Sequence, residues 1–177
     1  MRIVAGRLGG RIFESPRTHR THPMSEKARG SLFNALGDIE NLSVLDAYAG
    51  SGALSLEAVS RGAKSVLAID IDVEAVKTIA KNSALLGLED YITVRRKNIS
   101  GWSRNSQDKK FDIVIADPPY TDIRPDVIKR LSAHVGADGV FCLSWPASEA
   151  IRQINGFEVA SNKSLGDIQL VFYRRKV

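Results

Sequence analysis

From residue 43 onward, short apolar runs alternate with segments of helical periodicity, and this alternation restricts the fold more than any other feature of the sequence. Runs rich in branched residues are typical of buried strands, and strands that alternate with helices form a parallel sheet covered on both faces. The strands are expected at residues 43–48, 65–70, 91–94, 111–116 and 139–145. We therefore predict a Rossmann-like, doubly wound α/β domain with a mostly parallel sheet, closed by a C-terminal antiparallel hairpin of residues 157–160 and 168–173.

Helices are predicted between these strands, with one more ahead of the first. Ser25 is placed to cap a helix that ends at Leu36, before Gly37. Gly30 inside that helix costs about 1 kcal/mol relative to alanine, so either packing holds the helix or the backbone approaches another group closely. The other predicted helices cover residues 53–61, 73–86, 125–135 and 147–154, and a polar loop is expected around residues 101–110.

The N-terminal region is strongly basic. Residues 1–30 contain seven Lys or Arg and two Glu, whereas the remaining 147 residues carry equal numbers of both signs. The Gly9-Gly10 pair between short apolar pairs favours a hairpin. We predict a basic arm at residues 1–24 and a second unit at residues 25–177. Such an arm favours a polyanionic partner, most simply nucleic acid, although a solvated basic face is an open alternative.

The composition also bounds the class of protein. With 44% hydrophobic residues, a chain of 177 residues can bury a normal core. The single cysteine, Cys142, cannot form an intrachain disulfide and is expected in the core, in a reducing compartment. His19 and His22 without supporting Cys or carboxylates are too few for a metal site. No apolar segment approaches the roughly 20 residues of a membrane span, and the N-terminus lacks a signal-peptide core. The protein is expected in the cytoplasm.

A glycine turn follows the first predicted strand. Gly50 and Gly52 allow the turn and leave no side chain between the backbone and a ligand. The dinucleotide fingerprint has a third glycine where this chain has Ser55, which disfavours a pyrophosphate ligand. Asp46, just inside the strand, favours a ligand with an ammonium group, because a carboxylate repels phosphates.

Polar residues follow the next two strands. Asp70 lies 20 residues after Gly50, the spacing at which a carboxylate accepts both hydroxyls of a ribose, although it could equally cap a helix. Asp72 is better placed to be that cap. Asn98 could bind an adenine edge or could be an ordinary turn asparagine.

The fourth strand ends at Asp117-Pro118-Pro119-Tyr120. Neither proline can donate to a sheet ladder, so the strand stops at a rigid corner. At the C-terminal end of a parallel strand, this corner would hold a carboxylate, an exposed carbonyl and an aromatic ring beside the ligand crevice.

In this order, the four motifs resemble the class I S-adenosylmethionine-dependent amino-methyltransferases. The block from Asp46 to Ala63 is similar to the RsmD-type methyltransferases of small-subunit (16S) ribosomal RNA, which modify guanine at N2. The resemblance implies S-adenosylmethionine as cofactor and S-adenosylhomocysteine as product. It implies catalytic roles for Asp117, Pro118, Pro119 and Tyr120. Cofactor contacts are expected from Asp46, Ala49, Gly50, Gly52, Asp70, Ile71, Asn98 and Ile99. RNA contacts are expected from Arg2, Arg7, Arg11, Arg17, Arg20, His22 and Arg29.

Two departures from the family pattern concern the expected target. The family usually has Arg-Pro-Thr where this chain has His22-Pro23-Met24, and Arg-Glu where it has Arg29-Gly30. A DNA adenine-N6 or cytosine-N4 methyltransferase shares the corner motif, and a non-catalytic RNA-binding module could share the fold. A nicotinamide-dependent oxidoreductase is disfavoured by Ser55. The expected partner is ribosomal RNA, free or within a small-subunit particle, bound by a monomer without a metal.

Overall fold

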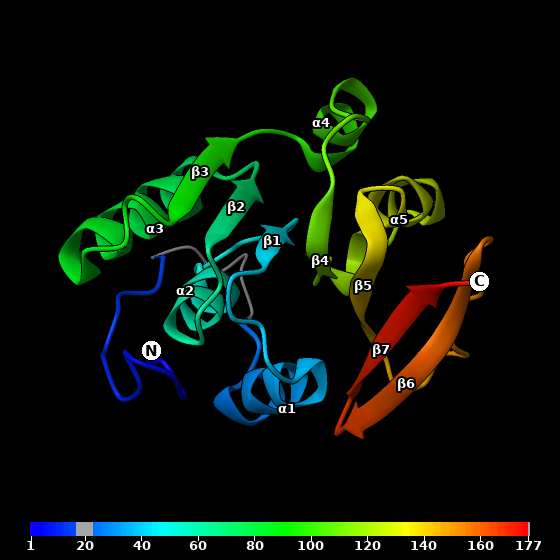
Figure 1. The fold of residues 1–177 in the computed structure, drawn as a ribbon, viewed down its shortest axis with the longest axis horizontal. Helices are drawn as coiled ribbons and strands as arrows, with labels where there is room; N and C mark the ends of the chain where they lie inside the picture. The colour runs from blue at the N-terminus through cyan, green and yellow to red at the C-terminus, as the bar shows by residue number, and fades with distance from the viewer. Residues whose placement is uncertain (17–22, 177) are drawn as a thin grey trace.

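The computed structural model describes residues 1–16 and 23–176 and contains one seven-stranded sheet with the strand order β3-β2-β1-β4-β5-β7-β6. The strands are β1 (Ser43–Asp46), β2 (Ser65–Asp70), β3 (Ile92–Arg96), β4 (Phe111–Ala116), β5 (Val135–Pro146), β6 (Phe157–Leu165) and β7 (Ile168–Arg175). The helices are α1 (Glu26–Leu36), α2 (Ala53–Ser60), α3 (Val73–Leu86), α4 (Ile99–Asn105) and α5 (Pro125–Ser132), with a 3₁₀ turn η1 (Tyr120–Asp122). Figure 1 shows this arrangement.

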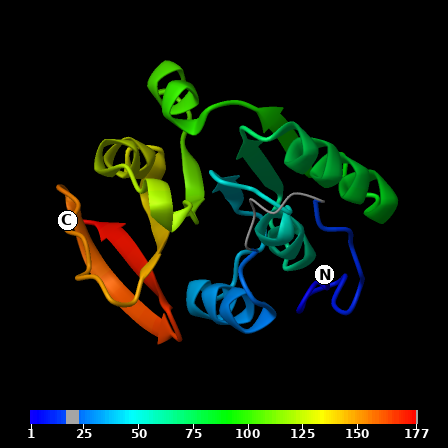
Figure 2. The same ribbon diagram turned by 180° about the vertical axis from the view of Figure 1, so that it is seen from behind.

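Helices cover both faces of the sheet (Figures 1 and 2). Strands β1 to β5 run parallel to one another, and β7 runs antiparallel to both β5 and β6. Val44 of β1 packs in a cluster with α1, α2 and α3, whereas the next residue, Leu45, packs in a second cluster with α4 and α5. Because successive side chains point to opposite faces, the central strands are buried on both sides of the sheet. The doubly wound sheet and the closing hairpin are confirmed.

Two predicted segments are wrong. The expected polar loop after β3 contains α4, whose Trp102 ring packs 4.8 Å from the His134 ring and 6.5 Å from Phe111. The helix expected at residues 147–154 does not form. The segment instead forms a turn at residues 147–148 followed by irregular chain, and Gln169 of β7 donates hydrogen bonds to the carbonyls of Pro146 and Glu149.

The N-terminal arm forms a narrow hairpin that packs on α2. Arg2 and Ile12 form an antiparallel bridge, and Ile3 is fully buried. Gly6 has a φ of 81°, and a Cβ there would lie 2.0 Å from the Ser60 carbonyl oxygen. The backbone of Gly6 therefore touches the last turn of α2 so closely that no other residue fits.

A buried carboxylate, Glu57 of α2, holds the arm in place. Its two oxygens accept hydrogen bonds from the backbone N–H groups of Val4, at 2.7 Å, and Ala5, at 3.0 Å. The same oxygens pair with the guanidinium groups of Arg29, at 3.4 Å, and Arg61, at 2.8 Å. One carboxylate thus joins the arm, α1 and α2 without leaving a buried charge unpaired.

The prediction that Arg29 binds RNA is wrong. Arg29 is 0% exposed, and its guanidinium donates to the carbonyls of Met24 and Arg2 as well as to Glu57. The adjacent Gly30 leaves a Cβ at an ordinary 3.5 Å from the Val4 side chain. Packing around Arg29, rather than a close backbone approach at Gly30, therefore holds α1.

Within the part of the chain that the structure describes, no helix is long and apolar enough to cross a bilayer. The same residues include no group of three or more His, Cys, Asp or Glu side chains placed to hold a metal ion.

Candidate active site

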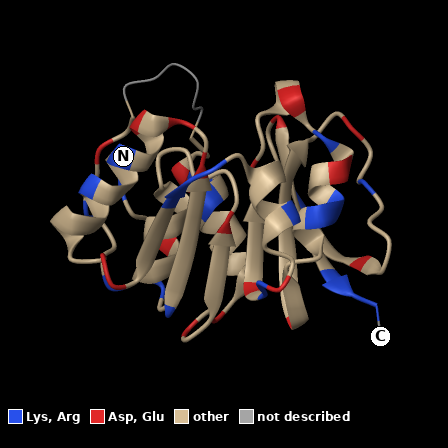
Figure 3. Ribbon diagram, turned by 90° about the horizontal axis from the view of Figure 1, so that it is seen from above, with Lys and Arg blue, Asp and Glu red and all other residues tan. Residues whose placement is uncertain are grey.

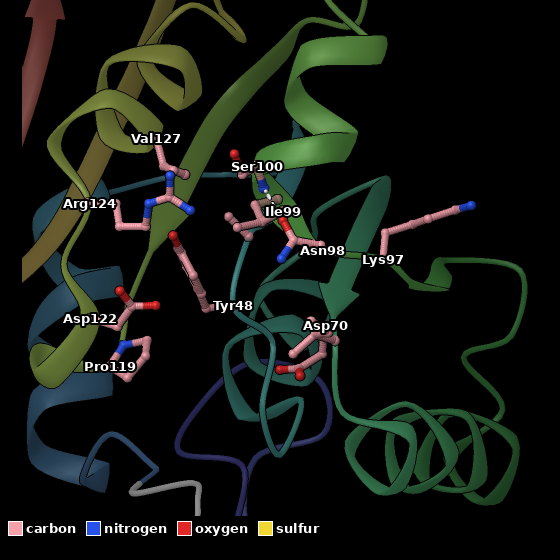
Figure 4. Close-up of a pocket in the computed structure, with 12 residues that line it drawn as sticks. Tyr48, Asp70, Lys97, Asn98, Ile99, Ser100, Pro119, Asp122, Arg124 and Val127 are labelled. Atoms are coloured by element: carbon pink, nitrogen blue, oxygen red, sulfur yellow. Dashed lines mark hydrogen bonds between the residues drawn. The ribbon is translucent and has the colours of Figure 1, made fainter.

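The strand order reverses at β1, which pairs with β2 on one side and β4 on the other. Such a switch point opens a crevice at the C-terminal ends of the strands. A pocket of about 190 Å³ lies at this edge. Figure 4 shows its lining residues: Ala47, Tyr48, Asp70, Ile71, Lys97, Asn98, Ile99, Ser100, Pro119, Asp122, Arg124 and Val127.

The glycine turn after β1 is held by the end of β2. The Ala49 N–H donates to the Ile69 carbonyl at 3.0 Å, and the Gly50 N–H donates to the Asp70 carboxylate at 2.7 Å. Gly52 has a φ of 78°, and a Cβ there would lie 2.8 Å from the Ile79 side chain of α3. Gly52 is therefore required both by the backbone conformation and by the packing of α3.

Asp46 is buried beneath the glycine turn. Its carboxylate accepts a hydrogen bond of 2.6 Å from the Ser55 hydroxyl of α2. Burial raises the pKa of Asp46 to about 7, against the opposing effect of this hydrogen bond. Ser55 therefore stands where the dinucleotide fingerprint has glycine because its hydroxyl orients a buried acid. A buried acid that titrates near neutral pH is suited to pair with a cation.

Asp70 lies at the end of β2 with both oxygens fixed by the backbone. One oxygen accepts from the Gly50 N–H and the other from the Asp72 N–H at 2.8 Å. Asp72 caps α3 by accepting from the backbone N–H groups of Glu74 and Ala75, as expected. Asp70 lines the pocket with its carboxylate oriented by these contacts, and each oxygen has a further lone pair for a ligand hydroxyl.

Asn98 lies between β3 and α4, and its side chain points into the pocket (Figure 4). Its amide oxygen caps α4 by accepting from the N–H groups of Ser100, at 3.0 Å, and Gly101, at 3.3 Å. Asn98 therefore caps a helix that was not predicted, rather than standing in an ordinary turn, and contact with an adenine edge stays a prediction. Ile71, which is 61% exposed, and the buried Ile99 give the pocket apolar walls.

The corner after β4 borders the same pocket through Pro119. Burial raises the pKa of Asp117, while a hydrogen bond from Ser144 of β5 opposes the rise. The Tyr120 hydroxyl lies 2.6 Å from the Ser144 hydroxyl, and the Tyr120 side chain remains partly exposed at the rim. Ser144 therefore contacts both Asp117 and Tyr120 of the corner.

Several lining residues were not predicted. Tyr48 comes from the glycine turn, and burial raises the pKa of its hydroxyl to about 12. Asp122, Arg124 and Val127 come from η1 and the start of α5, because the chain folds back over the pocket after the corner. The position of Tyr48 inside the glycine turn was the one signal that could have identified it. Ser144 could not be identified, because 24 residues separate it from Tyr120.

The expected RNA-binding residues do not share one environment. Arg7 and Arg11 are exposed, and the Arg7 guanidinium lies 4.7 Å from the centre of the Tyr91 ring. Arg2 is exposed and pairs with Glu26 at 2.7 Å. Arg17, Arg20 and His22 lie outside the described residues. Basic residues also occur on strand ends and helices beyond the arm (Figure 3).

Comparison with known proteins places the chain in a family. The family model described as "Conserved hypothetical protein 95" matches residues 1–174. The chain belongs to this family. The resemblance to RsmD-type methyltransferases is therefore confirmed over nearly the whole chain.

Relatives in this family carry descriptive names. The chain is 33% identical over 119 residues to "Ribosomal RNA small subunit methyltransferase D" of Buchnera aphidicola, covering 67% of this chain and 62% of that protein. It is 33% identical over 121 residues to the protein of the same name from Escherichia coli K12, covering 68% of this chain and 60% of the relative. These matches span about three fifths of the relatives' lengths.

A solved structure is similar over its full length. "Putative methyltransferase yhhF from Escherichia coli" superposes with a TM-score of 0.89 at 26% identity, covering 99% of this chain and 98% of that one. The chain therefore has the class I methyltransferase fold and shares it with this structure over 99% of its length.

Proposed function

We propose that the protein transfers a methyl group from S-adenosylmethionine to the exocyclic N2 of a guanine in small-subunit ribosomal RNA. The observation that carries the proposal is the position of the Asp117-Pro118-Pro119-Tyr120 corner, which borders a pocket whose other walls carry Asp70 and the apolar Ile71. The names of the relatives support ribosomal RNA as the substrate.

The donor set fits the proposed cofactor. Asp46 is a buried acid suited to attract an ammonium group, and Asp70 is oriented to accept ribose hydroxyls. Ile71 and Ile99 offer apolar surface to an adenine ring, and Asn98 directs its side chain into the same space. The turn at Ala49, Gly50 and Gly52 would let the ligand approach the backbone. S-adenosylmethionine, when bound here, supplies a methyl group on a good leaving group.

The chain must then make the amino nitrogen of guanine a nucleophile. That nitrogen is conjugated with the purine ring, so its lone pair is poorly available. The Asp117 carboxylate and the Pro118 carbonyl would each accept one of its N–H bonds, which shifts the nitrogen toward tetrahedral geometry and turns the lone pair to the methyl group. The Tyr120 ring would stack on a flipped base and fix its plane. Positioning of this kind can supply about 7–11 kcal/mol of the barrier.

The nitrogen loses a proton as it gains the methyl group. The raised pKa of Asp117 makes its carboxylate a suitable acceptor, because the affinity of a carboxylate for a proton rises with its pKa. Asp117 would thus orient the amino group and then receive the proton.

Radiolabelled S-adenosylmethionine with protein-free small-subunit RNA, small-subunit particles or duplex DNA tests the substrate. The proposal expects label in RNA and mapping of the labelled nucleotide to guanine N2. Label in duplex DNA would favour the DNA methyltransferase alternative. Calorimetry that detects no cofactor binding would favour a non-catalytic RNA-binding module.

An Asp117→Ala variant tests the corner itself. We expect folding and cofactor affinity to stay close to wild type while methyl transfer falls by several orders of magnitude, because the group that orients the nucleophile is gone. A fully active Asp117→Ala protein would reduce the corner to a strand-ending turn.

The exposed arginines of the arm are proposed to bind phosphates. An Arg7→Glu/Arg11→Glu variant should bind RNA more weakly and with a smaller dependence on salt, while its cofactor affinity is retained. Equal loss of both affinities would contradict this division of roles. A cytoplasmic location, a monomeric state and the division into an arm and a domain stay predictions.

A further inference from the structure

Three consecutive basic residues lie at the end of β3 and are all exposed: Arg95 and Arg96 are its last two residues, and Lys97 follows directly. The described residues place no carboxylate within 4.0 Å of these three cations, whereas exposed Arg2, Lys77 and Lys81 each pair with a Glu. Arg95 donates to the carbonyl of Val94, and Arg96 donates to the carbonyl of Ile71 at 3.3 Å. Three positive charges are thus gathered at one strand end without neutralisation by ion pairing.

Lys97 lines the candidate pocket and Arg96 lines a hollow beside it, whereas Arg95, the residue before Arg96, lines neither. Because side chains alternate along a strand, Arg95 and Arg96 lie on opposite faces of the sheet, and Lys97 follows directly after the strand. β3 is an edge strand, so its outer side is not paired with another strand. A shallow hollow lined by Ile71, Arg96, Lys97 and Asn98 adjoins the main pocket and shares three of these residues with it.

The proposed cofactor does not account for this charge, because S-adenosylmethionine carries no phosphate. Protection of an exposed sheet edge is a second function of Lys and Arg on edge strands. Charges that only protect an edge need not gather at one end of the strand. In β3 the basic residues stand together at the C-terminal end, whereas Thr93 and Val94 occupy the middle. The cluster therefore points to an anion that lies beside the pocket.

Arg7 of the arm lies too far from the pocket to bind an anion beside it. The Arg7 guanidinium lies over Tyr91, which directly precedes β3, whereas Arg95 to Lys97 follow at the other end of the strand. Six residues of extended chain separate Tyr91 from Lys97, which is about 20 Å at about 3.3 Å per residue. Phosphates bound by Arg7 are thus far from the pocket, and those next to the target nucleotide need another partner.

We propose that Arg95, Arg96 and Lys97 bind the phosphates that flank the target nucleotide and form a second RNA-contacting surface. The RNA would run along the edge of the sheet from Arg7 to this cluster. The inference rests on the proposed function for the identity of the polyanion, but RNA binding can be measured without methyl transfer.

An Arg95→Gln/Arg96→Gln variant tests the cluster, because neither side chain lines the main pocket. Lys109→Gln/Lys110→Gln is the matched control. It removes the same charge from two exposed residues just before β4, at the N-terminal end of that central strand and away from the pocket. Binding of a protein-free small-subunit RNA fragment is measured over a range of salt concentrations, together with cofactor affinity by calorimetry.

We expect the Arg95→Gln/Arg96→Gln variant to lose about tenfold in RNA affinity near 0.1 M salt. The slope of log affinity against log salt should fall by about 1.4 for two lost phosphate contacts on a single strand. Cofactor affinity should stay within about twofold of wild type, and the control should keep the wild-type salt slope.

Several results would overturn the inference. One is an unchanged salt slope, and another is an equal loss in the control, which would reflect net charge alone. A loss seen only with assembled particles and not with protein-free RNA would assign the cluster to an acidic protein surface. A wild-type protein that binds RNA but transfers no methyl group would contradict the proposed function and leave the binding result for this surface intact.

Discussion

The hydroxyl groups of Tyr120 and Ser144 lie 2.6 Å apart, so the corner after β4 is fastened to the neighbouring strand β5. Leu143, the residue before Ser144, pairs with Ala116, the last residue of β4. Ser144 is therefore in register with the start of the corner, where its hydroxyl also bonds Asp117. One hydroxyl thus contacts the two side chains to which the proposed mechanism gives a role.

Replacing Ser144 with Ala should slow methyl transfer by roughly tenfold while cofactor affinity is unchanged, because the corner loses orientation and keeps its backbone. The hydrogen bond from Ser144 lowers the pKa of Asp117, so its loss should move the acidic limb of the pH–rate profile to higher pH. Ser144→Thr keeps a hydroxyl and is the control. A loss of rate without any shift of the acidic limb would contradict the contact with Asp117.

Cofactor affinity should depend on the ionisation of Asp46. Its pKa is about 7, so the carboxyl group is mostly neutral below pH 7 and must lose its proton to pair with an ammonium group. Affinity should therefore fall by up to about tenfold per pH unit below pH 7 and level off above it. Calorimetry from pH 5.5 to 8.5, as approximate limits, measures this. Asp46→Asn should bind more weakly with no such dependence, and an identical pH dependence in that variant would assign the titration elsewhere.

The same raised pKa affects the stability of the cofactor-free protein. Between pH 3.8, the ordinary value for the unfolded chain, and about pH 7, the native state holds a proton that the unfolded state has lost. The Asp46 contribution to the free energy of unfolding should therefore decrease as pH rises through this window and stay constant above it. Urea denaturation of wild type and Asp46→Asn at several pH values would isolate the contribution.

Arg29 should affect stability rather than RNA recognition. Arg29→Met leaves part of the buried Glu57 charge unpaired and two backbone carbonyls without a donor, so we expect a loss of about 3–5 kcal/mol in the free energy of unfolding. Denaturation in urea measures the loss, and RNA titration below the transition measures binding by the folded protein. An Arg29→Met variant with normal stability and weakened RNA binding would instead support the original prediction that Arg29 contacts RNA.

Two glycines of the arm form a matched pair. Gly6 and Gly10 both have positive φ values, of 81° and 85°, but a Cβ on Gly10 meets nothing within 4 Å. Gly10→Ala should cost about 1–2 kcal/mol for its backbone conformation alone. Gly6→Ala must also displace the Ser60 carbonyl, so it should cost more and expose the arm to limited proteolysis. Equal effects of the two substitutions would contradict the close approach at Gly6.

Most of the fold could be predicted because its strands are short, buried and rich in branched residues. The predicted bounds of β2, α3 and β4 agree with the structure to within one residue, since each is marked by a capping or breaking residue at its end. α4 was missed because its sequence, which contains Gly101 and several serines, has weak helical propensity and depends on Trp102 packing against His134. Contacts of this kind join distant segments and leave no local pattern.

The candidate site, like the fold, could be predicted where local sequence patterns mark it. Its polar residues stand directly after strands, and the parallel sheet brings Asp46, Asp70, Asn98 and Asp117 to one edge. Arg29 was misplaced because its partner Glu57 is 28 residues away, and an arginine beside a basic arm gives no sign of being buried. The sequence gives the number of basic residues, but only the packed structure shows which of them are exposed to solvent.

The helix α2 begins at the glycine turn and ends at the Ser60 carbonyl, where the arm is seated. Its eight residues span about 12 Å and are all buried. The helix is therefore a rigid spacer of fixed length between the proposed cofactor site and the arm. A polynucleotide bound to the arm would then reach the pocket at a fixed distance from the arm. The length of strand between the two contacts would decide which nucleotide enters the pocket.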